Sequence, residues 1–320
     1  MFKLSATLLL LAVHHLTQVL CIGELGFNLP ATDNNGNCKT TDDWVSDLET
    51  VKTYGSSVKI YAVSDCNALQ TLGPAAEQVG SVKLWLGIWE VDDAHFEAEQ
   101  NALSTYLPEI DSSLVNGFLV GSEALYRGDL SPSALAGKIQ TIQKLVSNIN
   151  DKNGKSYSGF PVGTVDSWNM FVNGTNAPAI EAADMIMVNA FPYWQGQDAA
   201  NASYSFVDDI MQAVQSIQSI KGTDFWIEVG ETGHPTSGTT LQGKDGMSSV
   251  PSVDNAETLW QTGICALRAY GISVNVFEAF DEPWKPLATA DTGQVSDVER
   301  HWGVWDSNGS LKYNITCGFD

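Results

Sequence analysis

The 320-residue chain is predicted to fold as a single-domain (β/α)8 barrel, and three observations support this prediction. Eight short apolar runs recur along the chain, and segments with helical periodicity lie between them. Most of these runs are continuously apolar rather than alternating, as strands covered on both faces must be. No glycine-rich phosphate loop follows the first run, which argues against a dinucleotide-binding sheet. Strands that alternate with helices over roughly 300 residues fit a closed α/β barrel.

The predicted strands are the apolar runs, whose β-branched and aromatic residues favour extended backbone. They lie near residues 22–28, 57–62, 82–89, 116–123, 160–165, 185–191, 225–231 and 274–280. Each run is long enough for one barrel strand, and no linker or low-complexity tract separates them into domains.

The segments between the strands contain helices with recognisable ends. A helix within 130–149 is expected to begin after Ser131 as N-cap, with Pro132 in its first turn. Two others, within 203–222 and 254–271, end at glycines, the residue type that most readily takes the left-handed conformation after a helix.

Residues 1–21 are interpreted as a secretory signal peptide, which leaves residues 22–320 as the catalytic barrel domain. Lys3 precedes an apolar run over residues 6–13, and cleavage is expected just after Cys21. A membrane anchor is the weaker alternative, because polar residues between His14 and Gln18 interrupt the run well short of a bilayer span. The polar C-terminal tail does not resemble a lipid-attachment signal.

Loss of Cys21 leaves an even set of cysteines, which suits an oxidising compartment. We expect the pairs Cys38–Cys66 and Cys265–Cys317, because each would join neighbouring segments, although four cysteines allow three connectivities. No cysteine or histidine spacing indicates a metal site, and we expect no metal or other cofactor. Four N-x-S/T sequons are candidate glycosylation sites: Asn173, Asn201, Asn308 and Asn314.

The formal charge of −22 excludes several classes of partner. Nucleic acid and anionic membranes would be repelled by such a surface, whereas a neutral polysaccharide would not. We expect a secreted, extracellular monomer without a membrane anchor.

Two glutamates are predicted at the carboxyl ends of strands, where barrel enzymes carry their active sites. Glu123 ends the fourth strand, and Glu231 ends the seventh. Glu228 lies three residues before Glu231, so strict alternation would place it on the opposite face, turned toward a helix or paired with a lysine or arginine. We therefore select Glu123 and Glu231 as the reactive pair.

Two carboxyl groups facing one cleft are what glycoside hydrolysis requires: one protonates the leaving oxygen, and the other attacks the anomeric carbon or stabilises charge there. Aromatic and neutral polar side chains at the other strand ends would hold the sugar. The candidates are Tyr61, Trp89, Trp168, Asn189, Tyr193, Trp194 and Trp284, of which about half are expected to be ordinary core residues.

The segments "FLVGSEALYRGDL", "VGTVDSWNMF", "VNAFPYWQGQ", "WIEVGETGHPTSG" and "VFEAFDEPWK" together resemble glycoside hydrolase family 17. They are most similar to its fungal cell-wall branch of endo-β-1,3-glucanases and β-1,3-glucanosyltransferases. The resemblance covers essentially the whole chain after the signal peptide.

This resemblance implies a retaining mechanism with Glu231 as nucleophile and Glu123 as acid/base, their carboxyl groups roughly 5–5.5 Å apart. It also implies sugar contacts from the second and sixth strands, together with a charged pair that helps to keep the nucleophile ionised. An acceptor chain would lie along an aromatic cleft. The residues that match the family are Tyr61, Asn189, Tyr193 and the pair Glu282 and Lys285, and Trp194 and Trp284 from the strand-end aromatics would line the acceptor cleft with Tyr193.

Two positions depart from the family pattern. His234 replaces the usual tryptophan after the nucleophile, which suggests a hydrogen bond or a pH dependence in place of a ring contact. Ser122 precedes the acid/base where asparagine is common in the wider clan.

Two other readings remain open from the sequence. The chain could be a non-catalytic glucan-binding wall protein on a barrel scaffold, which the intact glutamate pair disfavours, or a hydrolase for another β-linked polymer. The sequence does not distinguish hydrolysis from transfer to a sugar, because that depends on how well an acceptor competes with water.

Overall fold

The computed structural model describes residues 22–90, 92–243, 246–290 and 293–320, so the proposed signal peptide lies outside the described residues. Eight parallel strands close a barrel in the order β1-β10-β7-β6-β5-β4-β3-β2, which confirms the predicted fold. The barrel strands are β1 (Leu25–Asn28), β2 (Ser57–Lys59), β3 (Lys83–Ile88), β4 (Val115–Ser122), β5 (Val162–Ser167), β6 (Ile186–Asn189), β7 (Ile227–Glu231) and β10 (Val274–Val276).

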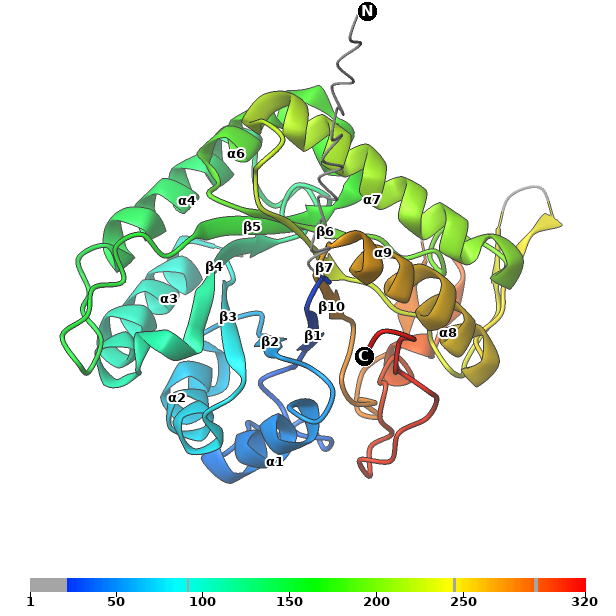
Figure 1. The fold of residues 1–320 in the computed structure, drawn as a ribbon, viewed down its shortest axis with the longest axis horizontal. Helices are drawn as coiled ribbons and strands as arrows, with labels where there is room; N and C mark the ends of the chain where they lie inside the picture. Colours follow the sequence, from blue (N-terminus) through cyan, green and yellow to red (C-terminus); the bar gives the residue numbers. More distant parts are fainter. Residues whose placement is uncertain (1–21, 91, 244–245, 291–292) are drawn as a thin grey trace, which may run out of the picture.

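Helices surround the strands, as Figure 1 shows, and cover the outer face of the barrel. They are α1 (Thr41–Val51), α2 (Ala68–Val79), α3 (Asp93–Tyr106), α4 (Pro132–Val146), α5 (Trp168–Val172), α6 (Ala177–Ala182), α7 (Ala199–Lys221), α8 (Val253–Leu259) and α9 (Cys265–Tyr270). Two hairpins, β8 (Leu241–Gln242) with β9 (Ser248–Ser249) and β11 (Ala288–Thr289) with β12 (Val295–Ser296), stand outside the barrel.

The helix ends largely follow the expected signals. Ser131 caps α4 by accepting a hydrogen bond from the Ala134 N–H, and Gly222 ends α7. The start of α7 was expected near residue 203, but the Asp198 carboxylate caps it from a position five residues earlier. The last predicted helix is interrupted by a π-helical turn over Trp260–Ile264, which separates α8 from α9.

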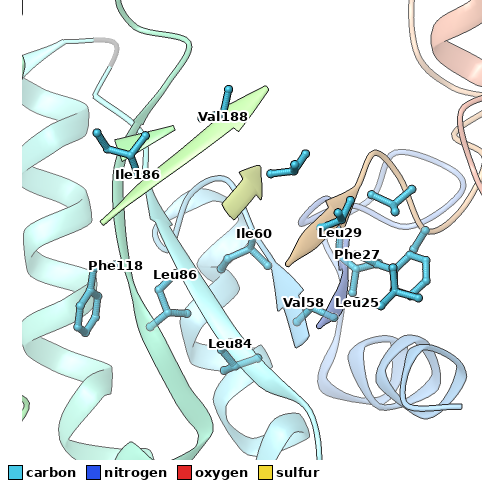
Figure 2. Packing of buried hydrophobic residues seen from close by; sticks show 14 of the residues in the cluster. Leu25, Phe27, Leu29, Val58, Ile60, Leu84, Leu86, Phe118, Ile186 and Val188 are labelled. Atoms are coloured by element: carbon cyan, nitrogen blue, oxygen red, sulfur yellow. The ribbon is translucent and has the colours of Figure 1, made fainter. Parts of the chain in front are cut away.

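Side chains of the barrel strands sort into two layers. Alternate residues such as Val58, Leu84 and Leu86 face the helices and belong to the large outer core (Figure 2). The residues between them face the interior, where a smaller apolar cluster fills one end: Trp85, Leu119, Val165, Met185 and Met187. The barrel interior is therefore packed rather than open, as is usual for this fold.

Both predicted disulfides are confirmed. Cys38 is bonded to Cys66, which joins the segments that follow β1 and β2. Cys265 on α9 is bonded to Cys317, which fastens the C-terminal segment to the helix layer. Among the described residues, no helix has the length and apolar character needed to cross a bilayer.

Candidate active site

A cavity of about 960 Å³ lies at the carboxyl ends of β4, β5, β6, β7 and β10. Both selected glutamates line it, Glu123 directly after β4 and Glu231 at the end of β7. Apolar and amide side chains from the loops after β5, β6 and β10 form much of its wall, including Trp168, Phe191, Trp194, Gln195, Gln197 and Phe277. A few convergent polar groups in a cavity with aromatic walls are typical of a ligand site.

A shift in strand pairing lies beside each glutamate and turns its side chain toward the cavity. The register between β4 and β5 shifts by one residue between Leu119 and Ser122, and Glu123 adopts a φ of 57°. A left-handed backbone at a residue other than glycine costs about 1–2 kcal/mol, and such strain is concentrated at functional sites. A second shift lies between β6 and β7, after Val188. Bulges of this kind re-aim side chains beside active sites.

The second shift corrects the expected position of Glu228. Val188 is paired with Val229, but the next residue, Asn189, is paired with Glu231. Gly230 also faces the interior, since a Cβ there would lie 2.7 Å from the Asn189 amide oxygen. Two consecutive residues therefore face inward, and strict alternation fails between Glu228 and Glu231.

Glu228 consequently points into the barrel at the end remote from the cavity, not outward toward a helix. It accepts hydrogen bonds from the Trp226 indole N–H at 3.0 Å and from the Asn275 amide at 3.3 Å, rather than pairing with a lysine or arginine. Burial raises the pKa of Glu228 to about 7, and the two hydrogen bonds oppose that rise.

Glu123 has the environment of a proton donor. Burial and the nearby Glu231 carboxylate raise its pKa to about 7. The Asn189 amide N–H donates to its Oε1 at 3.1 Å and works in the opposite direction by favouring the ionised form. A carboxyl group in this range can hold a proton in mildly acidic medium and release it within one reaction cycle.

Glu231 is held by a lysine that the sequence analysis missed. The Lys59 Nζ lies 3.0 Å from Glu231 Oε1, and Lys59 is 2% exposed. The same ammonium group lies 4.3 Å above the Tyr61 ring. The sequence contained a signal for this role. Lys59 lies inside the predicted strand 57–62, whose side chains are expected to be buried, and a buried cation needs a carboxylate partner.

Tyr61, which was expected to contact the sugar, lies beside Lys59 and is not among the residues that line the cavity. Its hydroxyl is buried and has no hydrogen-bond partner among the described residues. Burial raises the pKa of Tyr61 well above 10, and the charges of Glu231 and Glu278 raise it further. An unpartnered hydroxyl at this position can donate to a substrate oxygen.

Asp166 on β5 was also missed. It is fully buried, and it accepts the backbone N–H groups of Leu125 and Ser167 at 2.8 Å and that of Tyr126 at 3.2 Å. Burial raises the pKa of Asp166 to about 6, although these hydrogen bonds oppose the rise. The carboxylate thus secures the turn that begins at Glu123.

Lys285 is surrounded by carboxylates, but Glu231 is not one of those it contacts. Its Nζ pairs with Glu278 at 3.1 Å, with Glu282, and with Glu299 at 3.9 Å. Burial disfavours the cation, but Glu278 and Glu282 outweigh it and the pKa of Lys285 is raised. Of these carboxylates only Glu299 is among the residues that line the cavity. The rest of the cluster therefore lies behind the cavity wall.

Of the five remaining predicted aromatics, Trp89 packs against Tyr61 and Arg127 and does not line the cavity, and the other four separate into exposed, buried and cavity-lining residues. Trp194 and Trp168 line the cavity. Tyr193 does not: it is fully buried, donates its hydroxyl hydrogen to the Thr239 carbonyl at 2.6 Å, and packs beneath Trp194. Trp284 is 40% exposed, packs near Gly36 and is not among the residues that line the cavity. Tyr193 therefore supports the wall rather than facing a ligand directly.

His234, which differs from the family pattern, is buried in the protein core and does not line the cavity. His234 is 3% exposed, its Nδ1 donates to the Pro235 carbonyl at 3.0 Å, and Nε2 lies 3.4 Å from the Ser249 hydroxyl. Burial lowers the pKa of His234 to about 4. The imidazole is accordingly neutral in the range where the carboxylates act.

One group of described residues has the composition of a metal site. Ligand atoms of Asp65, His95 and Glu99 lie within 4.8 Å of one another, beside the Cys38–Cys66 disulfide. Glu99 already accepts the backbone N–H of Val63 and the hydroxyl of Ser64, and His95 Nε2 lies 2.9 Å from Asp65. These hydrogen bonds explain why the three side chains lie together without a metal ion.

The comparisons with known proteins agree with this geometry. A family model described as "Glycosyl hydrolases family 17" matches residues 19–317. The chain is 57% identical over 304 residues to a glucan 1,3-beta-glucosidase of Saccharomyces cerevisiae, covering 95% of this chain and 94% of the relative. It is 56% identical over 308 residues to the glucan 1,3-beta-glucosidase BGL2 of Candida albicans, covering 95% and 96%.

Solved structures with the same fold include a glycoside hydrolase family 17 beta-1,3-glucanosyltransferase from Rhizomucor miehei. The TM-score is 0.74 at 30% identity, covering 92% of this chain and 97% of that one. An active-site mutant of the Rhizomucor enzyme in complex with laminaritriose gives a TM-score of 0.75 at 30% identity, covering 92% and 98%.

Proposed function

Since the chain belongs to the glycosyl hydrolases family 17, we propose that it is a secreted, retaining glycosidase of β-1,3-glucan. It cleaves internal linkages and transfers the released glycosyl unit to a glucan acceptor or to water. The observation that carries this proposal is the pair in the cavity: Glu123 with a pKa raised to about 7, beside a Glu231 carboxylate held by the Lys59 ammonium.

In the first step, a Glu231 oxygen attacks the anomeric carbon while the bond to the leaving oxygen breaks and Glu123 donates its proton to that oxygen. The product is a glycosyl ester on Glu231. In the second step, the ionised Glu123 takes a proton from water or a sugar hydroxyl, whose oxygen attacks the anomeric carbon and releases Glu231. The configuration at that carbon is retained.

The substrate class is supported by the relatives and by the cavity. Two curated relatives are named glucan 1,3-beta-glucosidases, and an active-site mutant of a solved relative is in complex with laminaritriose. Trp168 and Trp194 offer ring faces to the C–H faces of glucosyl units, and the amides of Gln195 and Gln197 suit their hydroxyl groups. The two disulfides and the exposed sequons Asn173, Asn308 and Asn314 fit a secreted wall protein.

Two variants test the assigned roles. Glu231→Gln is expected to abolish turnover, because an amide cannot attack. Glu123→Gln is expected to nearly stop cleavage of laminari-oligosaccharides but to spare the first step with an activated aryl β-glucoside, and added azide should then restore turnover. Glu228→Gln is the matched control: a second buried glutamate on the same strand, whose loss should leave most activity.

The stereochemistry is read from the first product by proton NMR, which should show the β-anomer. With concentrated laminari-oligosaccharides, products longer than the substrate are expected early in the reaction. An α-anomeric first product, or equal loss of aryl and natural substrates without azide rescue in Glu123→Gln, would remove the proposed mechanism.

A further inference from the structure

At the opposite end of the barrel from the catalytic cavity, a tryptophan is fixed with its ring toward solvent. Trp226 directly precedes β7 and is 44% exposed. Its indole N–H donates inward to Glu228 Oε1 at 3.0 Å, and its ring lies edge-to-face on the Trp85 ring with centroids 5.4 Å apart. The sole polar atom of the side chain is thus satisfied inside, and the exposed part is a rigid apolar face.

Trp226 forms one wall of a second cavity, of about 590 Å³. The other walls are the C-terminal end of α4 and the segments that lead into β5 and β6, with Gln143, Ser147, Phe160, Pro161 and Asp184. Tyr157 forms its buried base and donates its hydroxyl hydrogen to main-chain carbonyls of Leu107 and Ile110, so this part of the lining is anchored.

A fixed acceptor stands beside the ring. Asp184 Oδ2 accepts hydrogen bonds from the Gln143 amide at 3.0 Å and from the Val162 N–H at 3.1 Å. The Gln143 amide also donates to the Ala182 carbonyl at 3.0 Å, so both side chains are held in place although Asp184 is exposed. The cavity therefore offers a preorganised carboxylate next to a flat apolar surface.

We propose that this cavity, with Trp226 as its platform, is a second, non-catalytic carbohydrate site that binds a segment of β-linked glucan. The inference rests on the proposed function. A sugar ring has an apolar C–H face for the indole and hydroxyl groups for the carboxylate and amide, whereas the Asp184 charge and the net charge of −22 disfavour anionic ligands. The volume lies within the range of small-ligand sites.

The two sites lie at the two ends of one strand. Trp226 precedes the start of β7 and Glu231 ends it, five residues later, which corresponds to about 16 Å along an extended strand. The sites open at opposite ends of the barrel, so a glucan segment in one does not continue directly into the other. The second site should therefore strengthen binding to a glucan matrix without altering turnover of short substrates.

The test measures binding to insoluble β-1,3-glucan particles by depletion, in a Glu231→Gln background that does not degrade the particles. Trp226→Ala removes the platform, and Ser147→Arg obstructs the cavity while keeping the hydrogen bond from Trp226 to Glu228. Tyr270→Ala is the matched control, an exposed aromatic residue at the C-terminal end of α9, which also leads into the start of a barrel strand. Thermal unfolding checks that each variant is folded.

Trp226→Ala and Ser147→Arg are each expected to weaken particle binding at least fivefold, and Tyr270→Ala to leave it unchanged. With Glu231 intact, all three should cleave laminaritetraose within twofold of the parent. If Trp226→Ala does not fold because Glu228 loses its partner, Ser147→Arg decides alone. Parental particle binding by folded Ser147→Arg, or loss of laminaritetraose cleavage equal to the loss of binding, overturns the second site. A parent that fails to cleave laminaritetraose overturns the proposed function instead.

Discussion

Truncation of Asn189 to alanine should move the basic limb of the pH–rate profile upward. The Asn189 amide donates to Glu123 Oε1 at 3.1 Å and favours the ionised carboxylate. Without this donor the ionised form is less stable, so Glu123 keeps its proton to higher pH. A hydrogen bond to a charged group contributes about 1.5–3 kcal/mol, which corresponds to about 1–2 pKa units. Because water can enter the space that the amide leaves, we expect a shift of about 1 unit.

The assay is kcat/KM for a laminari-oligosaccharide across the pH range, whose basic limb reports the pKa of the acid in the free enzyme. The parent should lose activity above a pH of about 7, which is the pKa of Glu123. Asn189→Ala should lose activity at a pH about one unit higher. Asn189→Ala also removes a group expected to contact the sugar, so the height of the profile should fall as well. The position of the limb, not its height, tests the reasoning.

Asn275→Ala is the matched control. Asn275 and Asn189 are each 1% exposed, both face the barrel interior, and both donate to a glutamate, but Asn275 donates to Glu228 at the far end. The two variants should lose similar stability, and Asn275→Ala should leave the basic limb unchanged. An unmoved or lowered limb in Asn189→Ala, or an equal shift in both, would refute the role given to this hydrogen bond.

Three further outcomes are expected. Lys59→Met should lower the free energy of unfolding by about 3–5 kcal/mol, because it leaves the buried Glu231 carboxylate without its cation, and should also lower kcat/KM; Lys59→Arg should recover most of both losses, and equal defects in the two variants would contradict the ion-pair argument. Asp166→Asn should lower kcat more than it raises KM, since it frees the turn that begins at Glu123; a pure KM effect in steady-state kinetics would oppose this. The pKa of His234 lies near 4 in the folded chain against an ordinary 6.5, so protonation favours the unfolded chain and stability is lost as pH falls from 6.5 toward 4, by up to about 3 kcal/mol. Urea unfolding at pH 7 and pH 4 should therefore show a smaller loss in His234→Phe than in the parent, and equal losses would contradict the assignment.

Most of the barrel could be predicted because burial leaves a strong pattern in the residues. Strands covered on both faces must be apolar throughout, and each of the eight predicted runs overlaps a barrel strand. Helix ends at Ser131 and Gly222 carry local chemistry that acts without tertiary contacts. The position of Glu123 and Glu231 at strand ends also follows from this pattern, whereas the register shifts that turn them toward the cavity do not.

What could not be predicted depends on contacts between strands. Nothing local marks Gly230 as part of a register shift, because the shift exists only in the pairing of β7 with β6. The partner of Lys59 lies 172 positions away in the chain, and a lysine at that place is compatible with several carboxylates. Tyr193 and Trp194 are adjacent aromatics, and only the packed structure separates the buried one from the one that faces the cavity.

The register shift at Gly230 has a consequence for how such an enzyme gains or loses activity. Removing that single glycine codon would leave Glu231 two residues after Glu228, so that strict alternation would keep it facing the interior but would move it by one residue, about 3.3 Å along the strand, from its place beside Lys59, while every catalytic side chain remained encoded. A barrel of this family can thus lose its activity through a deletion of one residue, although its sequence motif would still be recognisable. For the same reason, transplanting the glutamates onto another barrel requires transplanting the extra residue with them.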